Sequence, residues 1–102
     1  MARDLRDAGW LVRDRNRRCG GGELDLVAER GGEIRFVEVK TRAPGDPVAE
    51  ETIHHGKRRK LTYAAEAWLA GYDGPFSSAS FSVAMVEGDE ITWYHDAFDA
   101  EY

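Results

Sequence analysis

Two short runs of alternating residues, separated by a pair of glycines, constrain the fold of this chain more than any other feature. Residues 23–28 (ELDLVA) and 34–37 (IRFV) alternate between polar and apolar side chains, which is typical of half-buried β-strands. Gly31-Gly32 lies between them and is a signal for a two-residue hairpin turn, because the favoured turn needs positive φ at both central positions. The sequence therefore predicts an antiparallel hairpin.

The turn also predicts which residues of the hairpin face each other. With the two glycines at its centre, Arg30 faces Glu33, and counting outward places Asp25 opposite Glu38. Residues two apart on a strand share a face of the sheet. One end of one face is then expected to gather four charged residues: Glu23, Asp25, Glu38 and Lys40. The other face is expected to be mostly apolar, with Leu24, Leu26 and Ala28 against Val39, Val37 and Arg35.

The expected pairing of Asp25 with Glu38 suggests a metal site. Opposed side chains have Cβ atoms about 4.5–5.5 Å apart, and like charges placed in this way are destabilising. Solvent screening, protonation of one acid, or a cation between the two would resolve the conflict. Mg²⁺, with Mn²⁺ as a substitute, is a suitable cation because one or two carboxylates, water and a substrate phosphate complete its octahedron.

Lys40 adds a group that can work beside such a metal. Its ammonium can orient or help to deprotonate an attacking water and can stabilise charge on a phosphate. This interpretation makes Asp25 and Glu38 metal ligands and Lys40 the catalytic lysine, with Glu23 as an outer ligand or orienting residue. The alternative is a solvated strand surface, on which a Glu23–Lys40 ion pair contributes well under ~1 kcal/mol.

The remaining sequence predicts an α/β or α+β sandwich. Its expected elements are a short helix over 2–8 ended by Gly9, a strand over 10–17, a turn at 20–22, a loop over 43–47, a helix that starts between Thr52 and Lys57 and ends at Gly71, and strands over 80–86 and 91–94. Leu61, Ala64, Ala65, Trp68 and Leu69 form the apolar stripe of the long helix. Tryptophans at such helical and strand positions are expected in the core rather than stacked on bases.

Composition narrows the class of protein further. A chain of 102 residues is about one domain, which we take to span residues 1–102. The sequence has no apolar run of the roughly 20 residues that span a bilayer and no signal-peptide pattern, so a cytoplasmic protein is expected. The single cysteine, Cys19, excludes an internal disulfide and offers no metal cluster.

The charge is divided unevenly along the chain. All 14 Lys and Arg residues lie in residues 1–60, against 11 Asp and Glu there, whereas residues 61–102 carry 8 Asp and Glu and no Lys or Arg. Arg13, Arg15 and Arg17 alternate along the first expected long strand and should share one face, as a track for DNA phosphates or as a protected strand edge. Lys57, at the border of the helical stripe, is expected to reach toward the catalytic edge of the sheet.

The hairpin sequence resembles a known family. Residues 22–28 (GELDLVA) and 36–42 (FVEVKTR) resemble the YraN-like family of small bacterial proteins, within the restriction-endonuclease-like nuclease superfamily and similar to archaeal Holliday-junction resolvases. The superfamily signature is an Asp followed on the next strand by Glu-x-Lys, which Asp25 and Glu38-Val39-Lys40 match. The resemblance covers nearly the whole chain, and it implies that Lys57 is an accessory nucleic-acid-binding residue.

The resemblance implies a mixed five-stranded sheet flanked by helices, and a magnesium-dependent endonuclease for branched or structured DNA. Two-fold-symmetric junctions are usually cut by dimers, so a homodimer is also expected. Resolvase relatives complete the site with a glutamate from the first helix. Here the chain is expected to begin partway through that helix, and no Glu precedes Glu23. The alternatives are a non-catalytic nucleic-acid-binding domain and an adaptor that binds another protein.

Overall fold

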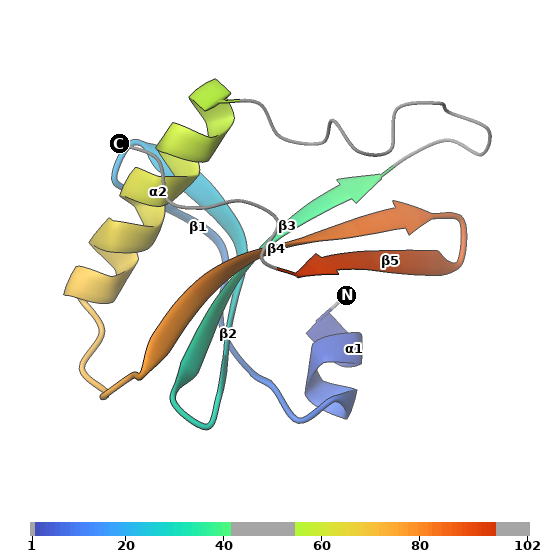
Figure 1. Cartoon of the computed structure of the whole chain (residues 1–102), viewed down its shortest axis with the longest axis horizontal. Coiled ribbons are helices and arrows are strands. Elements are labelled where there is room, and N and C mark those ends of the chain that lie inside the picture. The colour runs from blue at the N-terminus through green and yellow to red at the C-terminus, as the bar shows by residue number, and fades with distance from the viewer. Residues whose placement is uncertain (1, 42–54, 96–102) are drawn as a thin grey trace.

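One helix lies on each face of a twisted, five-stranded mixed sheet (Figure 1). The computed structural model describes residues 2–41 and 55–95. Along the chain the elements are α1 (Ala2–Asp7), β1 (Leu11–Cys19), β2 (Gly22–Arg30), β3 (Glu33–Thr41), α2 (His55–Ala70), β4 (Ser78–Glu87) and β5 (Glu90–His95). The expected elements are confirmed, with strand ends that differ by a few residues. The expected loop over 43–47 lies outside the described residues.

The strands lie in the sheet in the order in which they occur in the chain, β1-β2-β3-β4-β5. β3 and β4 pair in parallel, and the other neighbours are antiparallel. A parallel pair needs a long crossover connection, and α2 belongs to the segment that provides it. This is the predicted mixed sheet flanked by helices, and it is consistent with a restriction-endonuclease-like fold.

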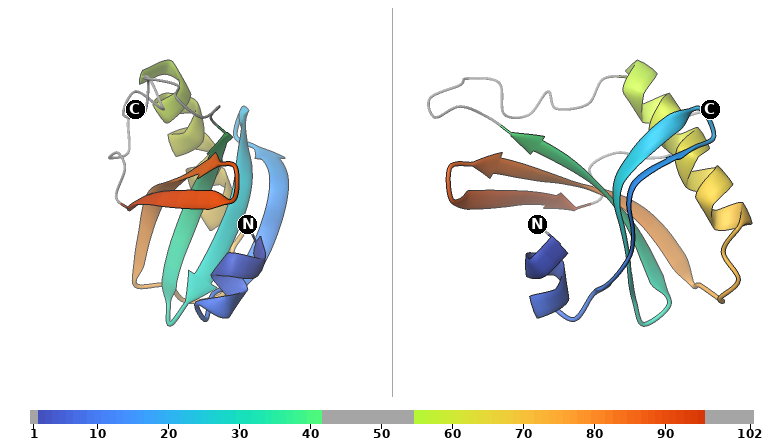
Figure 2. Two further views of the ribbon diagram at one scale, coloured as in Figure 1. Left: turned by 90° about the vertical axis from the view of Figure 1, so that its right-hand side faces the viewer. Right: turned by 180° about the vertical axis from the view of Figure 1, so that it is seen from behind.

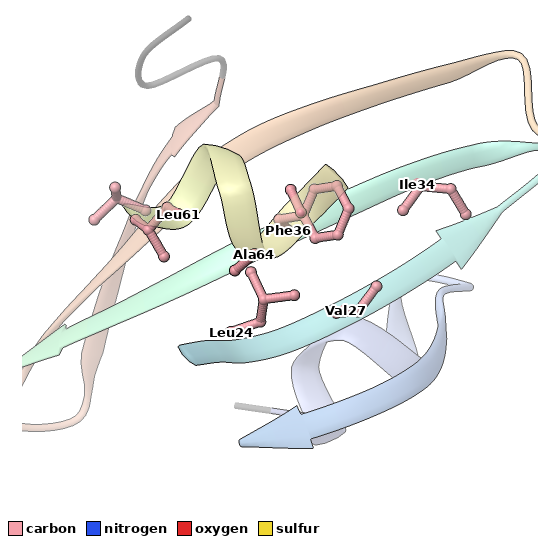
Figure 3. Packing of buried hydrophobic residues seen from close by; sticks show 8 residues of the cluster. Leu24, Val27, Ile34, Phe36, Leu61 and Ala64 are labelled. Atoms are coloured by element: carbon pink, nitrogen blue, oxygen red, sulfur yellow. The ribbon is translucent and has the colours of Figure 1, made fainter. Parts of the chain in front are cut away.

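The two helices cover opposite faces of the sheet (Figure 2). Under α2, side chains from the sheet and the helix form one cluster, drawn in part in Figure 3: Leu24, Val27, Ile34, Phe36, Leu61, Ala64, Ala65 and Val83. A second cluster lies on the α1 side: Leu5, Trp10, Leu26, Ala28, Val37 and Ala84. The sheet is therefore buried on both faces near its centre. Among the described residues, neither helix has the length and apolar character needed to cross a membrane.

The glycine turn predicted between β2 and β3 is confirmed. Gly31 and Gly32 have φ of 58° and 85°, as a type I′ turn requires, and Arg30 faces Glu33. Gly20 and Gly21 close the β1–β2 hairpin in the same way, with φ of 58° and 84°. Gly20 also lies against α2 so closely that a Cβ on it would be 2.4 Å from the Tyr63 carbonyl oxygen.

The predicted pairing between β2 and β3 is only half right. The antiparallel ladder runs from Arg30–Glu33 to Leu26–Val37 and goes no further, so the expected pair of Asp25 with Glu38 is not part of it. Leu24 was expected on the same face as Leu26. It packs instead under α2, whereas Leu26 packs on the α1 side. The strict alternation of β2 is therefore lost at Asp25.

β1 departs from regular geometry at two places, one of them opposite Asp25. Its register against β2 shifts between Val12 and Asp14, and Asn16 has a left-handed φ of 47°. Across this irregular stretch, Arg15 pairs with Leu26 on the α1 side and Arg17 pairs with Leu24 on the α2 side. Cross-strand partners share a face. The prediction that Arg13, Arg15 and Arg17 share one face is therefore wrong for Arg15.

Candidate active site where β2 and β3 separate

Asp25 lies at the point where β2 leaves β3. Its side chain is half-buried, and its Oδ2 accepts a hydrogen bond from the backbone amide of Val39 at 2.9 Å. The β2–β3 ladder ends at Leu26 and Val37, so the Val39 amide lies beyond it. The Asp25 carboxylate accepts the hydrogen bond of this amide in place of a backbone carbonyl of β2. This contact holds one carboxylate oxygen firmly against β3 and draws the Asp25 side chain to the same level as Glu38.

Glu38 is the buried acid of the site. Its side chain is only 7% exposed, and it follows Phe36 on the face of β3 that α2 covers. Lys57, from the first turn of α2, reaches it as predicted, with Nζ 2.6 Å from Glu38 Oε1. Burial raises the pKa of Glu38 above its usual range. The hydrogen bond to Lys57 opposes this rise, and the charge of Asp25 adds to it.

Lys40 completes a cluster of two acids and two lysines. It is half-buried on β3, two residues beyond Glu38 and on the same face. A hydrogen bond to Lys57, together with burial and the Lys57 charge, lowers the pKa of Lys40, although Glu38 and Asp25 act in the opposite direction. Burial disfavours the charge on Lys57, but its hydrogen bonds to Glu38 and Lys40 outweigh this and raise its pKa.

A surface pocket of about 400 Å³ opens over Asp25, Glu38 and Lys57, whereas Lys40 lies beside it and is not one of its lining residues. We call it the carboxylate pocket. Its lining residues are Gly22, Glu23, Asp25, Glu38, Lys57, Lys60 and Leu61. Glu23 therefore lies at the site, but the Glu23–Lys40 ion pair of the solvated-surface alternative is not among the ion pairs of the described residues. The Glu23 carboxylate instead lies 3.4 Å from Arg18 Nε, and both side chains are well exposed.

The donor set fits a hard divalent cation held mainly by water and substrate. In the contacts described here, Asp25 and Glu38 each use one oxygen, Oδ2 toward Val39 and Oε1 toward Lys57, so each has a second oxygen for a cation. Within residues 2–41 and 55–95, no group of three His, Cys, Asp or Glu side chains gathers as a metal site. Mg²⁺ typically uses one or two carboxylates in this way.

The predicted basic residues divide between this pocket and a second one. Lys57 lines the carboxylate pocket, whereas Arg13 and Arg17 line a hollow beside the C-terminal end of α2. Arg13 is held by Glu29, with Nη2 2.6 Å from Oε1. The position of Arg15, paired with Leu26 on the α1 side, removes it from both hollows.

Sequence reasoning did not single out Lys60, which lines the carboxylate pocket with Lys57. The two lysines are three residues apart in α2, so they lie on adjacent turns of one helical face. That spacing is the signal that could have identified Lys60. In the sequence alone, residues 57–60 resemble an ordinary solvated basic segment. The structure shows that Lys57 and Lys60 lie on the side of α2 that borders the pocket.

Comparison with known proteins shows close relatives in bacteria. The model of the uncharacterised protein family UPF0102 matches residues 1–92. A UPF0102 protein of Dechloromonas aromatica is 37% identical over 101 residues, covering 98% of this chain and 82% of the relative. One of Halorhodospira halophila is 42% identical, covering 95% and 78%. The UPF0102 protein YraN of Salmonella agona is 39% identical, covering 96% and 73%.

Proposed function

The chain belongs to the UPF0102 family, and we propose that it is a metal-dependent endonuclease for branched or otherwise structured DNA. The geometry of the carboxylate pocket supports the hydrolysis of phosphodiester bonds, and the resemblance to resolvases supports the choice of DNA. One observation carries the proposal. Glu38 is almost completely buried, yet the groups around it are another acid and two lysines. Ionisable groups with perturbed pKa values that gather beside a pocket are candidates for a functional site.

The side chains divide the work of such a reaction between them. Asp25 and Glu38 would hold Mg²⁺ or Mn²⁺, with Glu23 at the rim as an outer ligand or orienting group. When bound, such an ion acidifies a coordinated water and neutralises phosphate oxygens. The amide of Val39 fixes the orientation of the Asp25 carboxylate.

Lys40 is the residue we assign to the attacking water. Its lowered pKa leaves the amine unprotonated more often, at a given pH, than that of an ordinary lysine, so that it is available to accept a proton, while its charged form stabilises negative charge on the phosphate. Lys57 keeps Glu38 paired, and Lys57 and Lys60 present ammonium groups to a DNA backbone entering the pocket.

A second candidate function is a nucleic-acid-binding domain without catalysis. The observation in its favour is the 2.6 Å contact of Lys57 with Glu38, which compensates the buried carboxylate with an ammonium of the chain itself. A carboxylate that is paired within the chain in this way can stay buried without a metal. Under this alternative, the lysines of the pocket bind phosphates and no bond is cleaved.

Cleavage of a panel of labelled linear and branched DNAs, with Mg²⁺, Mn²⁺ or chelator, separates the two functions. The proposal predicts metal-dependent products that disappear in Glu38→Gln and Lys40→Ala, while DNA retardation persists in both variants. Asp7→Asn is the matched control, because Asp7 is exposed on α1, across the sheet from the pocket. Retardation without products in any metal supports the binding domain, and an active Glu38→Gln variant refutes the assignment of the site.

A further inference from the structure

A second hollow, of about 590 Å³, lies between β1 and the C-terminal end of α2. We call it the aromatic pocket. The residues that matter in it are Arg13, Asp14, Arg17, Trp68, Tyr72 and Asp73. Its volume is in the range of small-molecule sites. The proposed chemistry of the carboxylate pocket makes no use of it.

Stacked planar groups form one wall of the aromatic pocket. The Tyr72 and Trp68 rings stack with centroids 5.0 Å apart and planes 21° apart. The Arg13 guanidinium carbon lies 5.7 Å from the centre of the Tyr72 ring. Trp68 is anchored below by its edge contact with Phe36 and by a 2.8 Å hydrogen bond from Nε1 to Asp14. The stack therefore runs outward from a rigidly held Trp68 through Tyr72 to Arg13.

The charges in the aromatic pocket favour a base over a phosphate. Arg13 and Arg17 are balanced by Asp14 and Asp73, and Arg13 is further held by its ion pair with Glu29. A site for a phosphate alone would carry a clear excess of positive charge. A nucleobase instead offers a flat face for stacking and amino groups for a carboxylate such as Asp73 to accept.

The aromatic pocket lies on the same side of the sheet as the carboxylate pocket. Both border α2, and the β1–β2 turn contacts that helix at Lys60 and Tyr63, between the two hollows. From Lys60 to Ala67 the helix advances about 10 Å, at 1.5 Å per residue. This is roughly three nucleotide steps of 3.4 Å along one stacked strand.

We propose that the aromatic pocket binds an unpaired nucleobase of a DNA strand whose backbone continues to the carboxylate pocket. The base lies against the Tyr72–Arg13 stack, and Arg17 at the rim meets the adjacent phosphate. The inference rests on the proposed action on DNA and deepens it. A site that takes an unpaired base selects DNA with single-stranded or distorted segments over uninterrupted duplex.

The test measures binding in chelator, so that cleavage plays no part in it. A labelled single-stranded oligonucleotide is compared by anisotropy with abasic analogues in which one base at a time is missing. We expect one position at which loss of the base weakens binding by roughly tenfold, as stacking on an aromatic side chain implies. Tyr72→Leu should abolish that difference, whereas Tyr72→Phe should keep it. Tyr63→Leu removes an exposed aromatic on α2 outside the aromatic pocket and should also keep it.

A measurement on the unaltered chain protects the test against variants that fail to fold. An oligonucleotide carrying a photoreactive iodinated base at the sensitive position should crosslink to Tyr72 or Trp68. Equal binding of every abasic analogue, or crosslinks only outside the aromatic pocket, would overturn the proposal. The result also stands apart from the nuclease proposal. If binding depends on the base but no cleavage occurs, the aromatic pocket is still a base-binding site and only the nuclease proposal fails. If cleavage occurs but binding does not depend on the base, only the base-binding proposal fails.

Discussion

Replacing Lys57 with methionine tests whether the buried acid of the site depends on that lysine. Methionine has nearly the same helix propensity and similar length, so Lys57→Met removes the charge and little else. Loss of one partner of a fully buried ion pair costs about 3–5 kcal/mol. Here the Lys57 side chain is 37% exposed, and solvent screens its charge. We therefore expect Lys57→Met to lower the free energy of unfolding by about 1–2 kcal/mol at pH 8.

The loss should depend on pH with a defined sign. The pKa of Glu38 is higher in the folded chain than in the unfolded one, and removing Lys57 takes away an interaction that lowers it. A group whose pKa is higher in the folded chain makes its full contribution to folding stability at pH values below its pKa in the unfolded chain, about 4.3 for a glutamate. That contribution is lost as the pH rises through its pKa in the folded chain. The difference in stability between the parent chain and Lys57→Met should therefore be small near pH 4.5 and widen toward pH 8.

Urea unfolding followed by circular dichroism, in chelator and at several pH values, measures this difference. Adding Glu38→Gln to Lys57→Met should remove most of the pH dependence, because no carboxyl is left to titrate. Lys60→Met is the matched control, since Lys60 is an exposed lysine of the same pocket. A pH-independent gap, or one that the second substitution leaves unchanged, would refute the assigned role of Lys57.

Three further predictions test the fold and the site. Gly20→Ala should destabilise the chain by about 2–4 kcal/mol in urea unfolding, because its Cβ would overlap the α2 backbone. Gly21→Ala, with a similar φ but open space around it, should cost only about 1 kcal/mol. Arg17→Ala should reduce the salt dependence of DNA binding by about one phosphate contact in a titration over salt concentration, whereas Arg15→Ala on the other face should leave it unchanged. Glu38→Gln in the parent chain should be neutral or stabilising by up to ~1 kcal/mol at pH 8, because its raised pKa shows that burial of the charge opposes folding.

The hairpin could be predicted from the sequence because its signals are local. The φ values of Gly31 and Gly32 and the pairing of Arg30 with Glu33 follow from turn chemistry alone. The reach of Lys57 followed from helical spacing. Both predictions concern residues that are close together in one hairpin or one helix. In such segments the period of the element largely determines which side chains share a face.

The details of the site depend on features that periodicity does not encode. Counting outward from the turn assumes an unbroken ladder, but β2 separates from β3 at Asp25, and the Val39 amide bonds the carboxylate instead. The face of Arg15 was predicted wrongly because the register shift in β1 and the left-handed Asn16 reverse the alternation there. The stack of Tyr72 on Trp68 follows from the turn after α2, which no pattern of apolar residues indicates.

The strand order has a consequence for how the site forms as the chain folds. β1, β2 and β3 are joined by two tight glycine turns, so their pairing closes only short loops, whereas the parallel pairing of β3 with β4 must close a far longer one. Contacts between residues close in sequence tend to form sooner. We expect Asp25 and Glu38 to be brought together early, before α2 docks and delivers Lys57. The early meander would then carry two acids with only Lys40 beside them, and divalent cations should speed the docking step.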